Sequence, residues 1–332
     1  PKDDPKFVKG MKVLRELWDT TKDQGQTYSV GITLMLLEAA YSDVPQKVRG
    51  EYVMEVDPAK VKGPDLEWIK ELVAFLEKNR ASTGVWRYPY GGNEDNSNSQ
   101  YAVLGLKAAS RMGVHVSNPD EMWAKIVEFY LEHQEKTGPE VQLPDIKLKK
   151  GGDYVVKESK KSQKAYARGW GYEGMPNDDQ WLNRPRGSVH TAALVALTLA
   201  KCEANLPSKL AKKADIAIRD GLAWLAHYYL IDMNPAKPPN SEKNYHYYYL
   251  YGLERVGVLL GVEFFGSHPW YIDGAKYLVE KQNDKGWWHE PEIQTSSRNL
   301  QTCYALLFLK RATTPVKNPP KVPQQTPAWT DE

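Results

Sequence analysis

Acidic residues are the first candidates for chemistry in this chain. Asp95, the neighbouring pair Asp178 and Asp179, and Glu290 each lie in a polar stretch close to a run of apolar residues. Two carboxyl groups about 5–9.5 Å apart can cleave a glycosidic bond. A carbohydrate-active enzyme, with tryptophan and tyrosine side chains as sugar platforms, is therefore one hypothesis for this protein.

Histidine and cysteine provide a second set of candidates. His190, His246 and Cys303 are residue types that bind zinc. The favoured interpretation of both histidines is instead a hydrogen-bonded side chain in the wall of a cavity, and no metal or other cofactor is expected. Cys202 and Cys303 both fall in apolar helical patterns, which predicts buried thiols. The sequence contains no G-x-S-x-G, H-E-x-x-H, phosphate-binding-loop or paired C-x-x-C motif.

A repeated unit of helix, turn and helix is expected to position these residues. In residues 274–309 an amphipathic helix precedes Gly286 and a Trp-Trp pair, and an apolar helix follows. That second helix is predicted to be buried, because apolar residues cover nearly all of its faces. The same apolar pattern starts at residues 32, 101, 192, 248 and 304, and its last two intervals are both 56 residues. A regular spacing of this kind indicates a repeat architecture. The core-facing side of the first helix is predicted to contain Ala275, Leu278, Val279 and Gln282.

Composition limits the classes of partner. A net charge of +2 in 332 residues gives no strong field for nucleic acid, and no apolar run reaches the roughly 18 residues of a membrane span. The chain has 11 Trp and 20 Tyr but 6 Phe. Trp and Tyr suit half-wet cavity walls, and packing of the repeat turns is the alternative for the tryptophans. Because the sequence starts at Pro1 rather than Met, export after loss of a signal and a cytoplasmic location both stay open.

Two segments depart from the helical pattern. Residues 141–158 alternate weakly around Gly151 and Gly152, which is typical of a β-hairpin, within an insertion of about 139–168. The tail after residue 313 is rich in Pro, Lys and Gln, and is predicted to be disordered or to drape over the surface. The insertion is either a solvated hairpin face or a lip that binds a protein partner. Its lysines are Lys147, Lys149, Lys150, Lys157, Lys160, Lys161 and Lys164.

Residues 274–288 resemble the QW repeat of triterpene cyclases, with a Gly-Ala start, an aromatic residue, Gln282, Gly286 and a tryptophan. Residues 66–86 resemble a second copy, which has Asn79 in the Gln position and ends at Trp86. Over roughly residues 5–312 the chain is thus similar to the prenyltransferase and squalene-cyclase repeat superfamily. The resemblance implies an all-α fold: an α/α toroid of at least five helical hairpins. Residues 1–313 would form this single domain, with a small β-hairpin insertion, followed by a Pro-rich tail at 314–332.

The catalytic acid of class II terpene cyclases is not retained. Those enzymes protonate a polyene with an Asp in a D-x-D-D run before an inner helix, and the nearest counterpart here is Asp95-Asn-Ser-Asn98. Ser97 or Asn98 stands where the acid is needed, and Asp178-Asp179 lies several residues before its helix. The polar run also has a structural interpretation, because Ser97-x-x-Gln100 fits a capping box.

The zinc ligands of protein prenyltransferases are not retained either. Their D-x-C corresponds to Asn244-Tyr245-His246, and their later His corresponds to Gln301 in Gln301-Thr-Cys-Tyr. All three ligands differ, and side-chain amides are poor replacements for thiolate or imidazole.

Binding in a central cavity is therefore the favoured function, with an isoprenoid or other lipid as ligand and without the catalytic residues of the family. The alternatives are a protein-interaction toroid, a carbohydrate-active enzyme, and a divergent terpene cyclase or prenyltransferase. Candidate catalytic residues are Asp95, Asp178, Asp179 and His190. The residues predicted to line the cavity or bind the ligand are Trp86, Asn98, Gln100, Trp170, Tyr172, His190, Asn244, Tyr245, His246, Tyr247, Tyr248, Trp287, Trp288 and Gln301.

Overall fold

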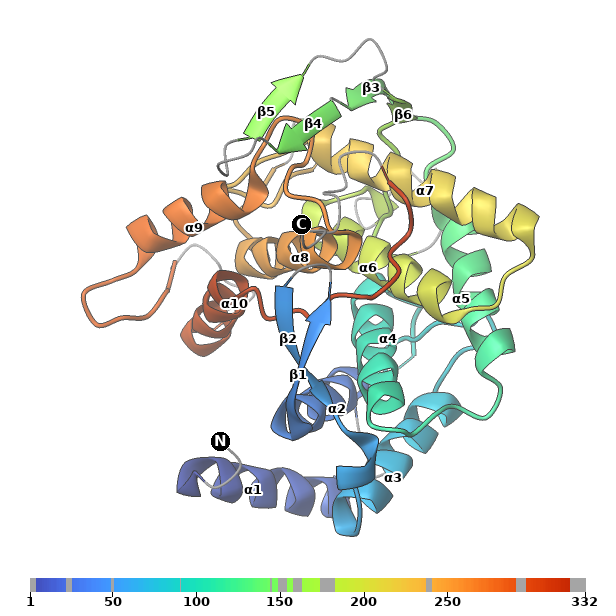
Figure 1. Cartoon of the computed structure of the whole chain (residues 1–332), viewed down its shortest axis with the longest axis vertical. Coiled ribbons are helices and arrows are strands. Elements are labelled where there is room, and N and C mark those ends of the chain that lie inside the picture. Colours follow the sequence, from blue (N-terminus) through green and yellow to red (C-terminus); the bar gives the residue numbers. More distant parts are fainter. Residues whose placement is uncertain are drawn as a thin grey trace. The chain divides into compact units, whose positions relative to one another are not determined.

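A computed structural model of the chain is mostly helical, with ten α-helices and small antiparallel hairpins in the part that it describes (Figure 1). That part comprises residues 4–21, 26–48, 51–89, 91–143, 145–148, 154–157, 163–173, 183–236, 241–290 and 297–322. The chain divides into two compact units: Pro1–Lys47 with Glu51–Pro119, and Val48–Gly50 with Asp120–Glu332. The helical content and the hairpin insertion confirm the coarse prediction of fold class.

The first unit contains two pairs of helices. Helices α1 (Pro5–Thr21) and α3 (Pro64–Lys78) are amphipathic, whereas α2 (Thr27–Tyr41) and α4 (Asn96–Arg111) are more deeply buried. Helices α2 and α4 run parallel, because Gly31 lies against the Tyr101 end of α4 and Glu38 pairs with Arg111 at the other end. The two backbones approach closely. A Cβ atom on Gly105 would lie 2.7 Å from the Cα of Gly31.

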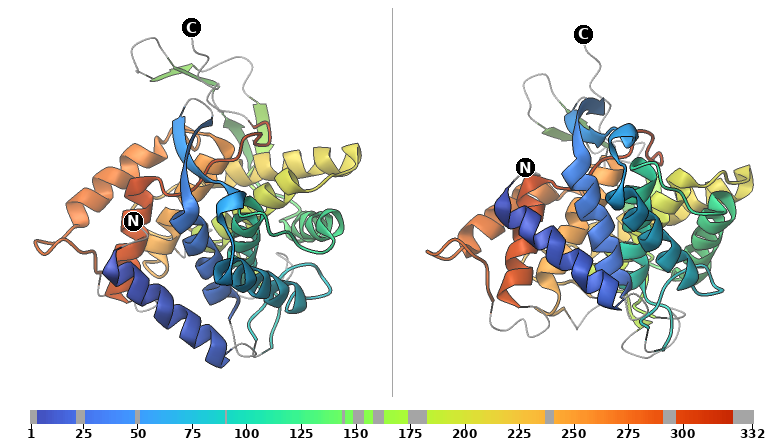
Figure 2. Two further views of the ribbon diagram at one scale, coloured as in Figure 1. Left: turned by 60° about the horizontal axis from the view of Figure 1, so that its bottom comes forward. Right: turned by 90° about the horizontal axis from the view of Figure 1, so that it is seen from below.

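The second unit has an inner layer of three parallel helices: α6 (Gly187–Glu203), α8 (His246–Leu260) and α10 (Arg298–Lys310). Helix α7 (Ser208–His227) packs against α6, and helix α9 (Trp270–Lys281) packs against α8 and α10. Further views of these helices are given in Figure 2. Every residue of α8 is buried, and its Gly252 admits the side chain of Thr191 from α6. Helix α9 runs antiparallel to α8, because its first residue, Trp270, packs on Gly257 near the end of α8. Helix α5 (Pro119–His133) precedes these elements.

A tryptophan side chain forms a hydrogen bond that closes the turn after each of three helices, α3, α5 and α9, which we call outer helices. Each indole Nε1–H donates to a backbone carbonyl in the last turn of the preceding helix; the carbonyl of Leu278 also accepts the backbone N–H of Gln282. The bonds are Trp86 to Leu76 (2.8 Å, after α3), Trp170 to Tyr130 (2.8 Å, after α5) and Trp288 to Leu278 (2.7 Å, after α9). These three indoles are at most 2% exposed. The repeated sequence unit therefore corresponds to a repeated hydrogen bond.

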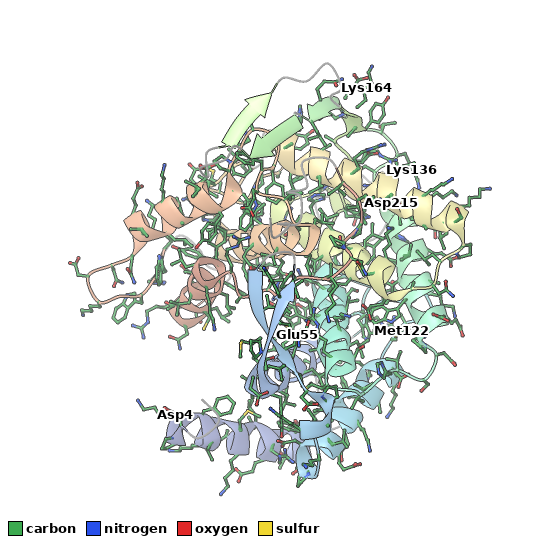
Figure 3. The ribbon with its side chains drawn as sticks, viewed as in Figure 1. Asp4, Glu55, Met122, Lys136, Lys164 and Asp215 are labelled. Atoms are coloured by element: carbon green, nitrogen blue, oxygen red, sulfur yellow. The ribbon has the colours of Figure 1, made fainter. Side chains whose placement is uncertain are left out.

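Two regions contain β-structure. The insertion forms an antiparallel hairpin in which β3 (Glu140–Leu143) pairs with β6 (Gln163–Tyr166), and β4 (Asp145–Leu148) pairs with β5 (Tyr154–Lys157). Lys164, labelled in Figure 3, forms an ion pair with Glu140 across this hairpin. Lys149, Lys150, Lys160 and Lys161 lie outside the described residues. Strands β1 (Ser42–Val48) and β2 (Glu51–Val56) form a second hairpin before the short 3-10 helix η2 (Pro58–Lys60).

The segment that follows α10 packs along the inner layer. The backbone N–H and the hydroxyl of Thr313 donate to the two carboxyl oxygens of Glu254, at 3.0 and 2.6 Å, and Val316 is buried. Burial outweighs these bonds and raises the pKa of Glu254 to about 7. Residues up to 322 follow this path, and residues 323–332 lie outside the described part.

The burial of three predicted elements differs from expectation. Cys303 is exposed and Cys202 is half-buried, so the prediction of two buried thiols is wrong. Helix α10 buries Gln301, Ala305 and Phe308, but leaves Leu300 and Leu306 about half exposed. Helix α9 buries Trp270, Gly274, Tyr277 and Leu278, whereas Val279 faces solvent. The buried face of α9 is displaced by one position from the face that hydrophobic periodicity predicts, because aromatic residues and a glycine form it. Among the described helices, none is both long and apolar enough to cross a membrane.

The glycine contact in the first unit can be tested with a matched pair of variants. Gly105→Ala should lower the free energy of unfolding by about 1–3 kcal/mol, since its Cβ would meet backbone that cannot move independently. Gly10→Ala lies in α1 with nothing within 4 Å of the new Cβ, and should stabilise the helix by up to about 1 kcal/mol. Urea unfolding monitored by circular dichroism measures both. Equal effects of the two changes would contradict the close approach.

The tryptophan bond distinguishes two adjacent residues. Trp288→Phe should lower the free energy of unfolding by about 2 kcal/mol, because the buried indole loses its bond to Leu278 and part of its packing. Trp287→Phe should cost less than about 1 kcal/mol, because this half-buried ring mainly contacts the guanidinium of Arg298. The same denaturation assay compares them. A larger cost at Trp287 would transfer the structural role to that residue.

Candidate functional site

Glu290 is the centre of a polar cluster in the second unit. Its carboxyl Oε1 accepts hydrogen bonds from the hydroxyl of Tyr247 at 3.2 Å and from that of Tyr277, while its Oε2 lies 3.2 Å from the ammonium of Lys243. We call these four residues, together with His246, the Glu290 cluster. They come from α8, from α9, and from the segments that precede α8 and α10.

Local structure explains how the cluster is assembled. Trp288 fixes the turn after α9, and Glu290 follows two residues later. The backbone N–H of Glu290 then donates to Oε1 of Gln301, at 2.8 Å, in the first turns of α10. Tyr247 lies in the first turn of α8, and Tyr277 lies near the end of the antiparallel α9, so both hydroxyls reach the same end of the inner layer.

The charge on the cluster is set by hydrogen bonds and by Lys243. Partial burial alone would raise the pKa of Glu290, but the bond from Tyr277 and the ammonium of Lys243 outweigh it and lower that pKa. Glu290 is therefore an ionised carboxylate near neutral pH. Burial and the neighbouring carboxylate raise the pKa of both Tyr247 and Tyr277, which keeps these phenols protonated as donors.

His246 is the neutral imidazole of the Glu290 cluster. Its ring lies 5.1 Å from that of Tyr277 and 5.7 Å from that of Tyr247. Burial lowers its pKa to about 4. Nε2 lies 2.9 Å from the carbonyl of Ile231, so it carries the proton, and Nδ1 is an acceptor. Within the described residues this buried Nδ1 has no hydrogen-bond partner.

The predicted site residues of this region separate into two groups. His246, Tyr247 and Gln301 come together at Glu290, which the sequence nominated only as a possible carboxylate for sugar chemistry. The other predicted residues support the backbone nearby. Asn244 accepts a bond from Asn234 through its carbonyl, and Tyr245 adopts a left-handed backbone with φ of 60°. The ring of Tyr248 contacts that of Tyr304, and the ring of Trp287 lies under the guanidinium of Arg298. Trp288 donates the hydrogen bond that closes the turn after α9. Tyr172 is half-buried.

Sequence reasoning missed Tyr277 and Lys243. Tyr277 was recoverable, because Trp270, Gly274, Tyr277 and Leu278 recur at i, i+4, i+7 and i+8 on one helical face. Lys243 carried no such signal, since it lies in an irregular segment and its contact with Glu290 spans 47 positions of the chain.

Asp95 is a structural cap in the first unit. Its carboxylate accepts bonds from the backbone N–H of Asn98 (2.8 Å), the amide of Asn98 (2.6 Å) and the hydroxyl of Ser97. Asp95, rather than Ser97, is the N-cap of α4, so the expected capping box is wrong by two residues. Burial raises the pKa of Asp95 even though these bonds oppose it. Gln100 is fully buried within α4, and Trp86 is the tryptophan that fastens the preceding turn.

His190 is a core residue of the second unit. Its ring lies between those of Trp170 and Trp224, and its Nε2 is 3.0 Å from the carbonyl of Gly221. Complete burial lowers its pKa to about 3, so it stays neutral and is not suited to proton transfer at neutral pH. Asp178 and Asp179 lie outside the described residues.

The positions that match zinc ligands hold side chains that are engaged in hydrogen bonds. His246 uses Nε2 for the carbonyl of Ile231, and Gln301 uses Oε1 for the N–H of Glu290. In the described part of the chain, no group of three or more His, Cys, Asp or Glu residues is placed to hold a metal ion. These side chains instead form a hydrogen-bonded frame around the carboxylate.

His190 predicts a measurable pH dependence of stability. Its pKa is about 3 in the folded protein and about 6.5 when unfolded, so the unfolded state binds the extra proton below pH 6.5. Stability should therefore fall as the pH falls. From pH 7 to pH 5 the wild type should lose about 2 kcal/mol more unfolding free energy than His190→Gln. Between pH 8 and 9 the difference between the two proteins should stay constant. If the difference in unfolding free energy between the wild type and His190→Gln is the same at pH 5 as at pH 7, His190 is not a neutral, low-pKa residue in the folded protein.

The assignment of the site rests on contacts within the chain. No protein-family model and no curated protein matches the sequence. Three features therefore define the candidate site: an ionised carboxylate, two phenols that donate to it, and a lysine ammonium that balances its charge.

Proposed function

We propose that the chain is a ligand-binding protein of the α/α-toroid kind that holds a single-chain lipid, isoprenoids included. The lipid's polar end lies at the Glu290 cluster and its apolar chain lies along α10. Parallel inner helices, the antiparallel α9 and the repeated tryptophan bond support the toroid. The resemblance of residues 274–288 and 66–86 to QW repeats supports it independently.

The observation that carries this proposal is the open apolar side of α10 next to the cluster. Leu300 is 48% and Leu306 is 54% exposed, and Cys303 between them is exposed as well. Gln301 of the same helix holds the backbone of Glu290. An apolar strip that begins beside a charged group matches the shape of an amphiphile.

Aromatic side chains border this strip on the side of α8. Tyr304 is half-buried, and its ring lies 5.7 Å from that of Tyr248 and 6.0 Å from that of Tyr251. The guanidinium of Arg255 lies 4.0 Å from the ring centroid of Tyr251. Tyrosines can contact an apolar chain with their rings and keep their hydroxyls bonded.

The other candidate functions have less support from the geometry. The positions that match zinc ligands are engaged in hydrogen bonds to backbone groups. Asp95 caps a helix in the other unit, so it is not a free acid for cyclisation. Glycoside cleavage uses a second carboxyl group, and the groups that contact the carboxylate of Glu290 are phenols and an ammonium.

Lipid binding can be tested by making the strip polar. Leu300→Asn and Leu306→Asn should each weaken the binding of a prenyl alcohol about tenfold, because a buried leucine contributes roughly 1.5–3 kcal/mol. Val279→Asn is the control: Val279 is 66% exposed on α9, which is not the helix that carries the strip, and its variant should bind like the wild type. Titration monitored by tryptophan fluorescence, with native mass spectrometry of the purified protein, measures binding. If the wild type retains no lipid and prenyl alcohols leave its melting curve unchanged, a protein-interaction role replaces lipid binding.

A further inference from the structure

The polar contacts of the Glu290 cluster restrict the chemistry of the ligand's head. Oε1 of Glu290 already accepts two phenolic hydrogen bonds, and Oε2 faces Lys243. Nδ1 of His246 is a further acceptor with no hydrogen-bond partner among the described residues, and the carboxyl group of Asp232 acts electrostatically on His246 and Tyr277. Oε2 and Nδ1 both accept hydrogen bonds, so a ligand that binds there has to be a donor.

Lys243 gives direct evidence for the kind of donor that fits. Its ammonium lies 3.2 Å from Oε2 of Glu290, donates to the carbonyl of Asp232 at 2.7 Å, and lies 5.9 Å from the ring centroid of Tyr277. A second ammonium, that of Lys281, lies 5.7 Å from the same ring. A carboxylate, a carbonyl oxygen and an aromatic ring are the groups that stabilise an alkylammonium ion.

From these contacts we infer that the ligand's polar end is a primary ammonium, and that the Glu290 cluster is a binding site for a long-chain alkylamine. Lys243 fills this site with its own ammonium when the ligand is absent. The inference rests on the proposed lipid binding and specifies the class of lipid.

Charge balance favours an amine over other lipid heads. The side chain of Glu290 is 13% exposed, so removal of its partner Lys243 leaves a nearly buried, ionised carboxylate. An incoming ammonium restores the pair, whereas an alcohol supplies one donor and no charge. A phosphate or carboxylate head would add a second negative charge beside Glu290, and like charges at this distance repel.

Lys243 is suited to leave the site. Its side chain is 30% exposed and lies in the irregular segment before α8, and its long aliphatic stem allows the ammonium to turn toward water. Affinity for an external amine then reflects competition with this tethered ammonium. Removing the competitor should strengthen binding, which distinguishes a replaceable occupant from a structural ion pair.

The experiment compares three ligands with the same chain: dodecylamine, dodecanol and dodecanoic acid, each below its micelle concentration. Isothermal titration at pH 7.5 measures their affinities for the full-length wild type and for Glu290→Gln, Lys243→Met and Lys281→Met. In the wild type the amine should bind at least tenfold more tightly than the alcohol. Glu290→Gln keeps the size of the side chain and should remove that preference.

Lys243→Met and Lys281→Met form a matched pair, since each removes one positive charge near Tyr277. Lys243→Met removes the ammonium that pairs with the carboxylate of Glu290, and should strengthen amine binding about tenfold. Lys281→Met leaves the pair intact and should change it less than about twofold. Circular dichroism confirms that each variant is folded.

The possible outcomes separate this inference from lipid binding itself. If the wild type binds amine and alcohol equally, or prefers the acid, the protein binds lipids and the ammonium assignment is wrong. An unchanged amine affinity in Lys243→Met also contradicts it, because Lys243 would then not occupy the site. If none of the three ligands binds, both the inference and the proposed function fail.

Discussion

The hydrogen bond from a buried indole to the end of an outer helix controls much of this structure. Backbone donors are scarce at the end of a helix, and Trp86, Trp170 and Trp288 each donate to a carbonyl in the last turn of the preceding helix. The bond ties the turn to the helix that precedes it. After α9 it has a further consequence, because it brings Glu290 to the end of the inner layer where Tyr247 and Gln301 lie.

Close packing of parallel helices determines which side chains meet at the end of the inner layer where Glu290 lies. Gly31 and Gly105 in the first unit, and Gly252 in the second, let neighbouring backbones approach to distances that no larger side chain allows. Parallel helices in contact keep their first residues level. Side chains from the starts of α8 and α10 therefore converge on one point, and the antiparallel α9 adds Tyr277 from its last turns.

Glu290, which contacts the first turn of α8, and Glu254, which lies within α8, show how environment decides charge. Glu290 is surrounded by phenol donors and an ammonium, and its pKa is lowered. Glu254 is more deeply buried, and two bonds from Thr313 only partly offset the cost of desolvation, so its pKa rises to about 7. A carboxylate balanced by a partly exposed ammonium is suited to exchange partners, whereas Glu254 is suited to fasten the C-terminal segment.

The sequence by itself determined the helices, the hairpin insertion and the position of the turns, because hydrophobic periodicity, glycine and tryptophan act locally. It also nominated His246, Tyr247 and Gln301, which the structure brings together. Only the tertiary structure decided that Asp95 is a cap, that His190 is a core residue, and that Tyr277 and Lys243 join Glu290. Those roles depend on contacts between residues far apart in the chain, and on burial, which fixes both charge and proton position. A local sequence pattern contains neither the long-range contacts nor the burial of a residue. For that reason the sequence predicts that the open side of α10 is buried.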